Sequence, residues 1–426
     1  MTATPTPFKI QVSDEKLGWI SERVRTANII PDVEHAEGKE WEDGVPSSVA
    51  NEYAEFWRNG YDWRAEEARI NATFDMFTVP IEEGGETIEL HFVHNRSKHA
   101  SAVPLLFAHG WPGNFMEVSL KGCRSSSANL LKLTEPEGDF PGFHIVAPSI
   151  PGFTFSSSPK VGIPPALNAT SGCSRCSQSQ SFTLGSVSSI YHKLMKILGY
   201  NHYLLQGGDW GSLITRIMAI QHPEACVGIH LNFLVAGLPS PLSEPITTIR
   251  FATGYFANTL RLELGKKWVM GSESGFSKIQ ATKPQTISYA LLDSPIGMLA
   301  WILDKLRALS TPGYEWDKTR VITWTIAYLL SDSSGHARIY KYARRNMEKE
   351  VLGKLIPAEV AFGASAFPHD PAYAPQWLVN ARIAKNIVFY NDSHRVGGHF
   401  PSVELPDVFI VRLLFLCFRS PLISIL

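Results

Sequence analysis

The run Gly-Gly-Asp-Trp-Gly-Ser at 207–212 places one carboxylate, Asp209, among small residues directly after the apolar stretch 202–206. Glycines permit a sharp turn from strand to helix, which exposes the side chain at the turn to a substrate. A serine is usual there, and it must first lose a proton. An aspartate carboxyl has a reference pKa of about 3.9, so it is charged at neutral pH and can attack an sp³ carbon directly. The predicted product is an alkyl ester of the protein that water must hydrolyse.

The residues after Asp209 support such a turn. Apolar side chains recur at helical intervals from Leu213 to Met218 and stop before Pro223, which predicts a helix over about 211–221. An aspartate at a helix start is also a common N-cap. This motif alone therefore leaves two interpretations of Asp209 open, a nucleophile or a helix cap.

A second motif, His-Gly-Trp-Pro-Gly at 109–113, follows the apolar run 103–108, which is typical of a buried strand. In α/β-hydrolases the loop after the corresponding strand contributes one backbone N–H to an oxyanion hole, and the residue after the nucleophile contributes the other. The predicted donors are Trp111 and Trp210. They would hold the carbonyl oxygen of the ester while water attacks it.

A third motif supplies a base. Gly-Gly-His-Phe-Pro at 397–401 follows the strand-like run 387–390. The hydrolase order is nucleophile, acid, histidine, and it favours His399 as the general base. His394 is the alternative, but it is closer to the strand end and lacks the flanking glycines.

These motifs, with five further segments, resemble the microsomal-type epoxide hydrolase family over most of the chain. The segments are GYDWR at 60–64, LHFVH at 90–94, SIPGF at 149–153, ATKP at 281–284 and DSPIG at 293–297. The resemblance implies hydrolysis of a small apolar epoxide to a vicinal diol, as in xenobiotic detoxification. The epoxide would be opened by Asp209, and the ester would be hydrolysed by water activated through His399.

The resemblance also implies an acid that orients His399. Phe-Pro-His-Asp at 367–370 matches its place and assigns that role to Asp370, with Asp392 as the alternative. The same resemblance implies no cofactor. It leaves His109, in the first loop, as an expected substrate-binding residue.

Two lid tyrosines are further implied, because the opening epoxide oxygen needs a proton donor. The motif at 338–342 favours Tyr340, with Tyr342 as the alternative on a different helix face. The second tyrosine aligns with Phe276, which keeps the ring in the substrate site and loses the hydroxyl. If that hydroxyl is worth one oxyanion-hole donor, its loss costs about 10²–10³ in rate.

Along the chain, apolar strand-like runs alternate with helical patterns. This alternation predicts an α/β-hydrolase fold with a mostly parallel sheet flanked by helices. We expect an N-terminal extension at 1–85 that packs on the body. The core would comprise 86–236 and 366–426, interrupted by a helical lid at 237–365. All three motif loops would then lie at the carboxyl ends of strands, where such sheets bind ligands.

Composition agrees with an enzyme of this size. The 426 residues are 44% hydrophobic and carry a net charge of −1, which gives no argument for nucleic acid or an anionic membrane. Five scattered cysteines favour a reducing, cytoplasmic compartment. Cys173 and Cys176 form a lone pair without further ligands, so no metal site is predicted. The N-terminus lacks signal-peptide features, and oligomerisation as a homodimer is left open.

Three stretches depart from the expected pattern. Segments 121–129 and 167–185 are interpreted as insertions or gene-model errors, the second with a loop-like composition. The apolar stretch 408–426 is interrupted by Arg412, Arg419 and Pro421, which favours a buried closing helix over a membrane span.

Two other functions remain open from the sequence. A haloalkane dehalogenase also uses an aspartate nucleophile, but it holds its halide with N–H donors rather than phenols, and Trp111, Trp210 and Phe276 keep it in consideration. A weakly active or inactive binding homologue is the other alternative, because one tyrosine is missing.

Overall fold

A nine-stranded sheet forms the centre of the molecule, in the order β1-β2-β3-β5-β4-β6-β7-β8-β9. The computed structural model describes residues 3–118, 130–136, 141–160, 182–257, 271–331 and 333–419. Neighbours from β5 through β9 pair in parallel, whereas β1, β2 and β3 join antiparallel at one side. The strands are β1 (Thr6–Phe8), β2 (Met76–Glu83), β3 (Glu86–Asn95), β4 (Val103–Ala108), β5 (Phe143–Pro148), β6 (Tyr203–Gly207), β7 (Cys226–Leu231), β8 (Ala361–Ser365) and β9 (Ile387–Asn391).

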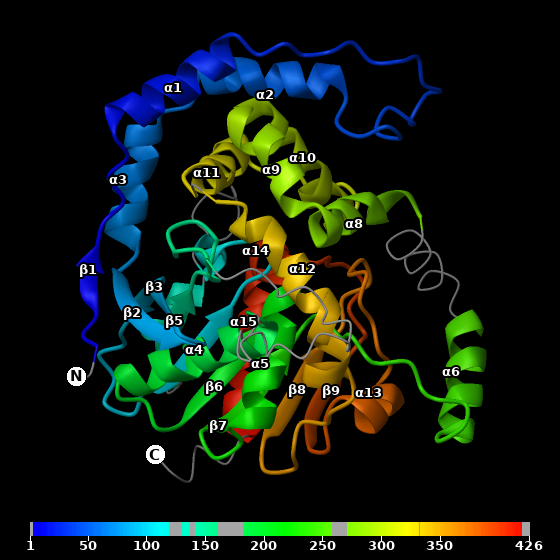
Figure 1. Ribbon diagram of the computed structural model, residues 1–426. Coiled ribbons are helices and arrows are strands. Elements are labelled where there is room, and N and C mark those ends of the chain that lie inside the picture. The colour runs from blue at the N-terminus through cyan, green and yellow to red at the C-terminus, as the bar shows by residue number, and fades with distance from the viewer. Residues whose placement is uncertain are drawn as a thin grey trace, which may run out of the picture.

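Helices lie on both faces of this sheet, which confirms the predicted fold class (Figure 1). Helices α4 and α5 lie on the near face and α15 lies behind the strands. The helices of the body are α4 (Leu184–Ile197), α5 (Asp209–Gln221), α13 (Gln376–Arg382), α14 (Pro401–Glu404) and α15 (Pro406–Arg419). The N-terminal helices are α1 (Asp14–Arg25), α2 (Ser47–Asn59) and α3 (Trp63–Thr73).

The remaining helices are inserted between β7 and β8. We call α8–α12 the lid helices, because they lie above the end of the sheet in Figure 1. The inserted helices are α6 (Pro245–Ala257), α8 (Gly275–Thr282), α9 (Pro284–Asp293), α10 (Pro295–Leu309), α11 (Lys318–Leu329) and α12 (Gly335–Met347). The connections between the N-terminal helices contact them: the Tyr61 hydroxyl, between α2 and α3, lies 3.0 Å from that of Thr323, and the Arg307 guanidinium lies 4.2 Å from the ring centre of Trp41, between α1 and α2.

Local sequence explains why these elements form. Every residue of β4 is buried, as expected for a central parallel strand covered on both faces. Helix α4 begins with a capping box in which the side chains of Thr183 and Ser186 each bond the other's backbone N–H. Helix α5 begins at Asp209, two residues earlier than the apolar periodicity predicts, because the turn residue itself takes the first helical position.

The sheet register brings the motif loops together. Gly207 at the end of β6 is the partner of Ala108 on β4 and of Leu231 on β7, and Leu231 in turn pairs with Ala364 on β8. Parallel strands aligned in this way end at one edge. The loops that carry Trp111, Asp209, Asp370 and His399 therefore emerge beside one another.

The apolar C-terminal stretch forms α15, whose Phe409, Leu413 and Leu416 are buried. Residues 420–426 and the segment 121–129 lie outside the described residues, as does 167–185 apart from its last four residues. In the part of the chain that is described, no single helix is long and apolar enough to cross a membrane. Helices α9 and α10 reach that length only as a pair, bent by 115°.

Candidate active site

Asp209 occupies a strained turn between β6 and α5. Its backbone φ is 49°, a left-handed conformation that is uncommon for a residue with a side chain. A Cβ on Gly211 would lie 2.0 Å from the carbonyl oxygen of Ala108, so only glycine permits this approach of α5 to β4. The N-cap of α5 is Gly208, not Asp209, which argues against the helix-cap interpretation. The Asp209 carboxylate instead accepts a hydrogen bond from the Trp111 backbone N–H, at 2.8 Å.

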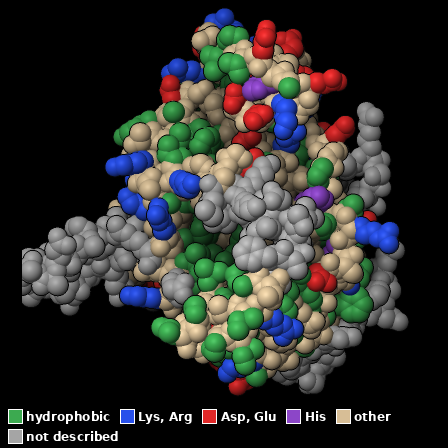
Figure 2. Space-filling model, turned by 90° about the vertical axis from the view of Figure 1, so that its right-hand side faces the viewer, with side chains coloured by type: hydrophobic (Ala, Val, Ile, Leu, Met, Phe, Trp, Pro, Cys, Tyr) green, Lys and Arg blue, Asp and Glu red, His purple; other side chains and the backbone are tan. Residues whose placement is uncertain are grey.

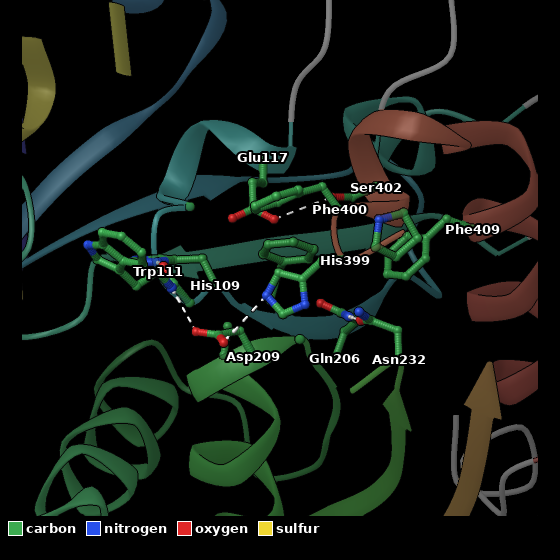
Figure 3. A pocket seen from close by; sticks show the side chains of 16 residues that line it. His109, Trp111, Glu117, Gln206, Asp209, Asn232, His399, Phe400, Ser402 and Phe409 are labelled. Atoms are coloured by element: carbon green, nitrogen blue, oxygen red, sulfur yellow. Dashed lines mark hydrogen bonds and ion pairs between the residues drawn. The ribbon is translucent and has the colours of Figure 1, made fainter. Parts of the chain in front are cut away.

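His399 lies between the carboxylates of Asp209 and Asp370, and Figure 3 shows its contact with Asp209. Its Nε2 is 3.4 Å from Oδ2 of Asp209, and its Nδ1 is 3.2 Å from Oδ2 of Asp370. Burial by itself lowers the pKa of His399, but the charges and hydrogen bonds of Asp370 and Asp209 outweigh it and raise the pKa to about 10. The two carboxylates thus favour the protonated form of the His399 ring in the free site.

The two alternatives from the sequence lie elsewhere. Asp392 is exposed and accepts a hydrogen bond from the Tyr373 hydroxyl at 3.2 Å. His394 is stacked on Phe367, with 4.5 Å between the ring centres. Asp370, by contrast, is 1% exposed, and its Oδ1 accepts the backbone N–H of Ala372.

The loop that carries His399 is anchored by Glu404, a residue that the sequence analysis did not single out. The Glu404 carboxylate accepts backbone N–H groups from Gly398 and Phe400, on either side of His399, at 3.1 Å each. It also accepts the N–H and the hydroxyl of Thr311, at 2.7 and 2.6 Å. The His399 N–H donates to the Leu309 carbonyl at the end of α10. His399 is thus fastened to a lid helix as well as to the core.

His109 has both ring nitrogens engaged within the chain. Nδ1 lies 3.0 Å from the Gly110 carbonyl oxygen, and Nε2 lies 3.2 Å from the backbone nitrogen of Ile150. Burial lowers the pKa of His109 to about 4, so the ring is neutral, with Nδ1–H donating and Nε2 accepting. This pairing orders the loop between β4 and Trp111 and leaves neither nitrogen for the substrate contact that the sequence analysis expected.

Tyr340 of α12 faces the nucleophile within an aromatic group. Its ring packs edge-on against Trp210 and Trp111, with centres 4.8 and 6.0 Å apart, and against Phe276 at 5.8 Å. The Phe276 ring stacks on Trp111 at 5.0 Å. Phe276 therefore lies where a second hydroxyl could face the site. Tyr342 packs instead against Phe182, outside this group.

A cavity of about 580 Å³ opens in front of Asp209, bordered by Trp111, Phe276, Tyr340 and His399. Its remaining walls are mostly apolar, with Leu213, Leu234, Val235, Phe251 and Trp377 among them. Figure 2 shows hydrophobic side chains gathered over the middle and lower part of the face on the α6 side, between scattered basic and acidic ones. The mostly apolar walls of the 580 Å³ cavity suit an apolar small molecule.

The two loops predicted to form an oxyanion hole lie beside Asp209. The Trp111 backbone N–H points at the Asp209 carboxylate. Trp210 is the second residue of α5, and N–H groups in the first turn of a helix have no partner within the helix. Both are therefore suited to a carbonyl oxygen formed on Asp209.

Glu117 is a further candidate that the sequence analysis missed. It lies above the His399 ring in Figure 3 and lines a second cavity of about 20 Å³, together with Asp209, Gln206 and Asn232. That is about the space of one water molecule. Burial raises the pKa of Glu117 to about 8, and the Ser402 hydroxyl donates to it at 3.4 Å. In the sequence, Glu117 could have been noticed as an acidic residue within the otherwise apolar run 115–118. Among the described residues, no group of three or more metal-ligating side chains is found.

Comparison with known proteins agrees with this geometry. A family model described as "Epoxide hydrolase N terminus" matches residues 5–118, and one described as "alpha/beta hydrolase fold" matches residues 103–315. A "Putative epoxide hydrolase" of Stigmatella aurantiaca is 32% identical, over 97% of this chain and 85% of the relative. Epoxide hydrolase 1 of Sus scrofa is 29% identical, over 94% and 86%. The solved Aspergillus niger epoxide hydrolase is 27% identical and covers 98% of this chain and 97% of that one, with a TM-score of 0.76.

Proposed function

The chain belongs to the epoxide hydrolase family and hydrolyses epoxides, and we propose that it does so through a covalent ester on Asp209. The observation that carries this proposal is the position of His399 between Asp209 and Asp370, at 3.4 and 3.2 Å. A nucleophile, a base and an acid that orients the base are the groups that this chemistry needs. The relatives favour neither a haloalkane dehalogenase nor an inactive binding protein.

In the first step, Asp209 attacks an epoxide carbon and the carbon–oxygen bond of the ring breaks. The leaving oxygen takes the hydroxyl proton of Tyr340, so the products are a neutral ester and a tyrosinate. The Trp111 N–H, 2.8 Å from Oδ1, orients the carboxylate for the attack. The imidazolium of His399 cannot act as a base at this stage, because it is already protonated.

In the second step, the ester is hydrolysed. Forming the ester removes the negative charge of Asp209, which helps to raise the pKa of His399. The imidazolium can then release its proton to solvent, and the Tyr340 oxygen takes one up. The neutral ring next takes a proton from water as that water attacks the ester carbonyl. When the ester carbon–oxygen bond breaks, the leaving alkoxide takes the remaining proton of that water, which gives the diol and restores the Asp209 carboxylate beside the imidazolium. Glu117 borders the small cavity beside His399. A carboxyl that is largely protonated near neutral pH can both donate and accept, as holding a water requires.

Two variants separate these steps. Asp209→Asn should form no ester, because a neutral amide is a poor nucleophile, whereas His399→Gln should open the epoxide and stall. Intact-mass spectrometry with styrene oxide should find the added substrate mass in the second variant and not in the first. Asp392→Asn is the matched control and should turn over like the wild type. If neither active-site variant gains mass while the wild type makes diol, the covalent mechanism is wrong.

Oxygen labelling tests the same proposal independently. With enzyme in excess over epoxide in ¹⁸O-water, the first diol should carry no label, and the label should enter the Asp209 peptide, because water attacks the ester carbonyl carbon. Label in the first diol would mean that water attacks the epoxide directly.

The substrate class proposed is an aryl or alkyl epoxide, supported by the apolar lining of the 580 Å³ cavity. A panel of small epoxides with diol detection ranks the candidates. A cytoplasmic location is supported by the buried thiol of Cys226, which forms no disulfide within the described residues, and cell fractionation tests it. A homodimer is supported by the exposed Ile30 and Val33 of the N-terminal segment, and light scattering tests it.

A further inference from the structure

Gln280 lies one helical turn after Phe276 on α8, so the two side chains share a face of that helix. It is fully buried, which is costly for an amide unless its polar atoms are paired. Its Oε1 accepts the indole N–H of Trp301 at 3.3 Å. Because an indole nitrogen can only donate, this contact fixes the amide with Oε1 toward Trp301 and Nε2 on the other side.

Gln280 shares its helix face with Phe276, whose ring centre lies 5.8 Å from that of Tyr340, and α8 packs against α12. The Trp210 ring centre lies 4.8 Å from that of Tyr340. Burial raises the pKa of Tyr340 well above its usual value, and the side chains of Trp210 and Gln280 offset part of this effect. Within the described chain, neither Gln280 Nε2 nor the Trp210 indole nitrogen has a hydrogen-bond partner. Both are thus buried, unpartnered donors beside Tyr340, and a hydrogen bond to its oxygen can form as charge develops there.

We propose that Gln280 is a positioning residue for the epoxide-opening step: together with the Trp210 side chain it donates N–H groups to the Tyr340 oxygen, and so supplies from α8 part of what the absent hydroxyl at Phe276 would supply. This inference rests on the proposed function, because it assigns Gln280 a role through the acid of that mechanism.

The donor and acceptor roles of the phenol explain how N–H groups at the Tyr340 oxygen assist the opening of the epoxide. A phenol has one proton to donate and an oxygen that accepts. When N–H groups occupy the oxygen, the O–H is left to point at another acceptor, and the 580 Å³ cavity that Tyr340 lines leads to Asp209. As the O–H bond breaks and the proton passes to the epoxide oxygen, the electron pair stays on the phenol oxygen. The same two N–H groups then stabilise that tyrosinate.

The test uses the His399→Gln variant, in which ester formation can be followed alone by rapid quench and intact mass. Adding Gln280→Met, which keeps the length of the side chain and removes the amide, should slow ester formation from styrene oxide about three- to tenfold, the usual worth of one hydrogen bond. Gln285→Met is the matched control. Gln285 is an exposed lid glutamine that bonds Ser334 and Arg338 at the start of α12, and its loss should leave the rate unchanged.

A double-mutant cycle distinguishes positioning from packing. In a Tyr340→Phe background, Gln280→Met should have no further effect on ester formation, because the hydroxyl through which it acts is absent. Restoring a phenol with Phe276→Tyr should recover most of the rate that Gln280→Met loses. Trp210→Phe, which keeps the backbone N–H, should slow ester formation by a similar factor and serves if Gln280→Met does not fold.

The outcomes separate this inference from the mechanism beneath it. If the His399→Gln parent forms no ester, the proposed function fails. If the parent forms ester and Gln280→Met forms it equally fast, or if the effect persists without the Tyr340 hydroxyl, the role of Gln280 is overturned and the mechanism stands.

Discussion

Removing the charge of Asp209 should lower the pKa of His399, and Asp209→Asn isolates this effect from catalysis. In the free site, Nε2 of His399 lies 3.4 Å from Oδ2 of Asp209, and the pKa of His399 is about 10. Two unit charges at that separation interact by about 5 kcal/mol at an effective dielectric constant of about 20, which corresponds to roughly 3.5 pKa units. Because an amide at this position can still accept a hydrogen bond, we expect a decrease of about two to three units.

The assay is an NMR titration of the histidine side chains in ¹⁵N-labelled protein. The His399→Gln spectrum identifies the signal of His399 by its disappearance. Asp392→Asn is the control, because it removes an aspartate charge from an exposed site bonded to Tyr373 and should leave the titration of His399 unchanged. An ordinary pKa for His399 in the wild type, or an unchanged one in Asp209→Asn, would refute the proposed switch from imidazolium to base.

The same shift has a consequence for stability. The folded-state pKa of about 10 lies above the ordinary value of 6.5 for a free histidine. A raised pKa contributes stability that is complete below the unfolded-state value and is lost as the pH rises through the folded-state value. The wild type should therefore lose stability between about pH 6.5 and 10. Asp209→Asn should lose less over that window in urea titrations, and an equal loss in both proteins would contradict the assignment.

Five further substitutions test the site. Glu117→Gln should slow ester hydrolysis about tenfold or more and leave ester formation unchanged in single-turnover mass measurements; slower ester formation would remove Glu117 from the water site. Phe276→Tyr should raise the rate of ester formation, and an unchanged rate would mean that a hydroxyl there does not reach the epoxide. Tyr340→Phe should cost about 10²–10³ in kcat/KM and Tyr342→Phe little; the reverse ranking would move the acid to Tyr342. Glu404→Gln should lower kcat and the free energy of unfolding, by about 1–3 kcal/mol for the latter, and full kcat would show that its anchor does not position the base.

Local patterns in the sequence were sufficient for the elements and for singling out Asp209 as the proposed nucleophile. The apolar run at 103–108 coincides with β4, because a central parallel strand must be apolar on both faces. Asp209 could be recognised because the glycines around it permit a conformation that other residues resist. The closing helix α15 followed from apolar content interrupted by charges. Each of these features depends on neighbours within a few residues.

The partners of these residues depended on tertiary structure. Asp370 and Asp392 both precede His399 in the chain, and only the pairing of β8 with β9 and the loops beyond it shows which carboxylate is buried beside the ring. His109 lies in a motif for which we predicted a substrate contact, yet both of its ring nitrogens pair with backbone groups. Sequence spacing does not show where a side chain finds its hydrogen bonds.

Glu117 and Gln280 show the same limit most clearly. Glu117 pairs with Ser402, 285 residues away in the chain, and Gln280 meets Tyr340 only where α8 packs on α12. A local pattern records a residue's type and its place on a strand or helix. The pKa of a buried group and the partner of a buried amide depend on charges and donors that only the folded chain brings close. For that reason Asp209 could be singled out from the sequence, whereas Glu117 and Gln280 could not.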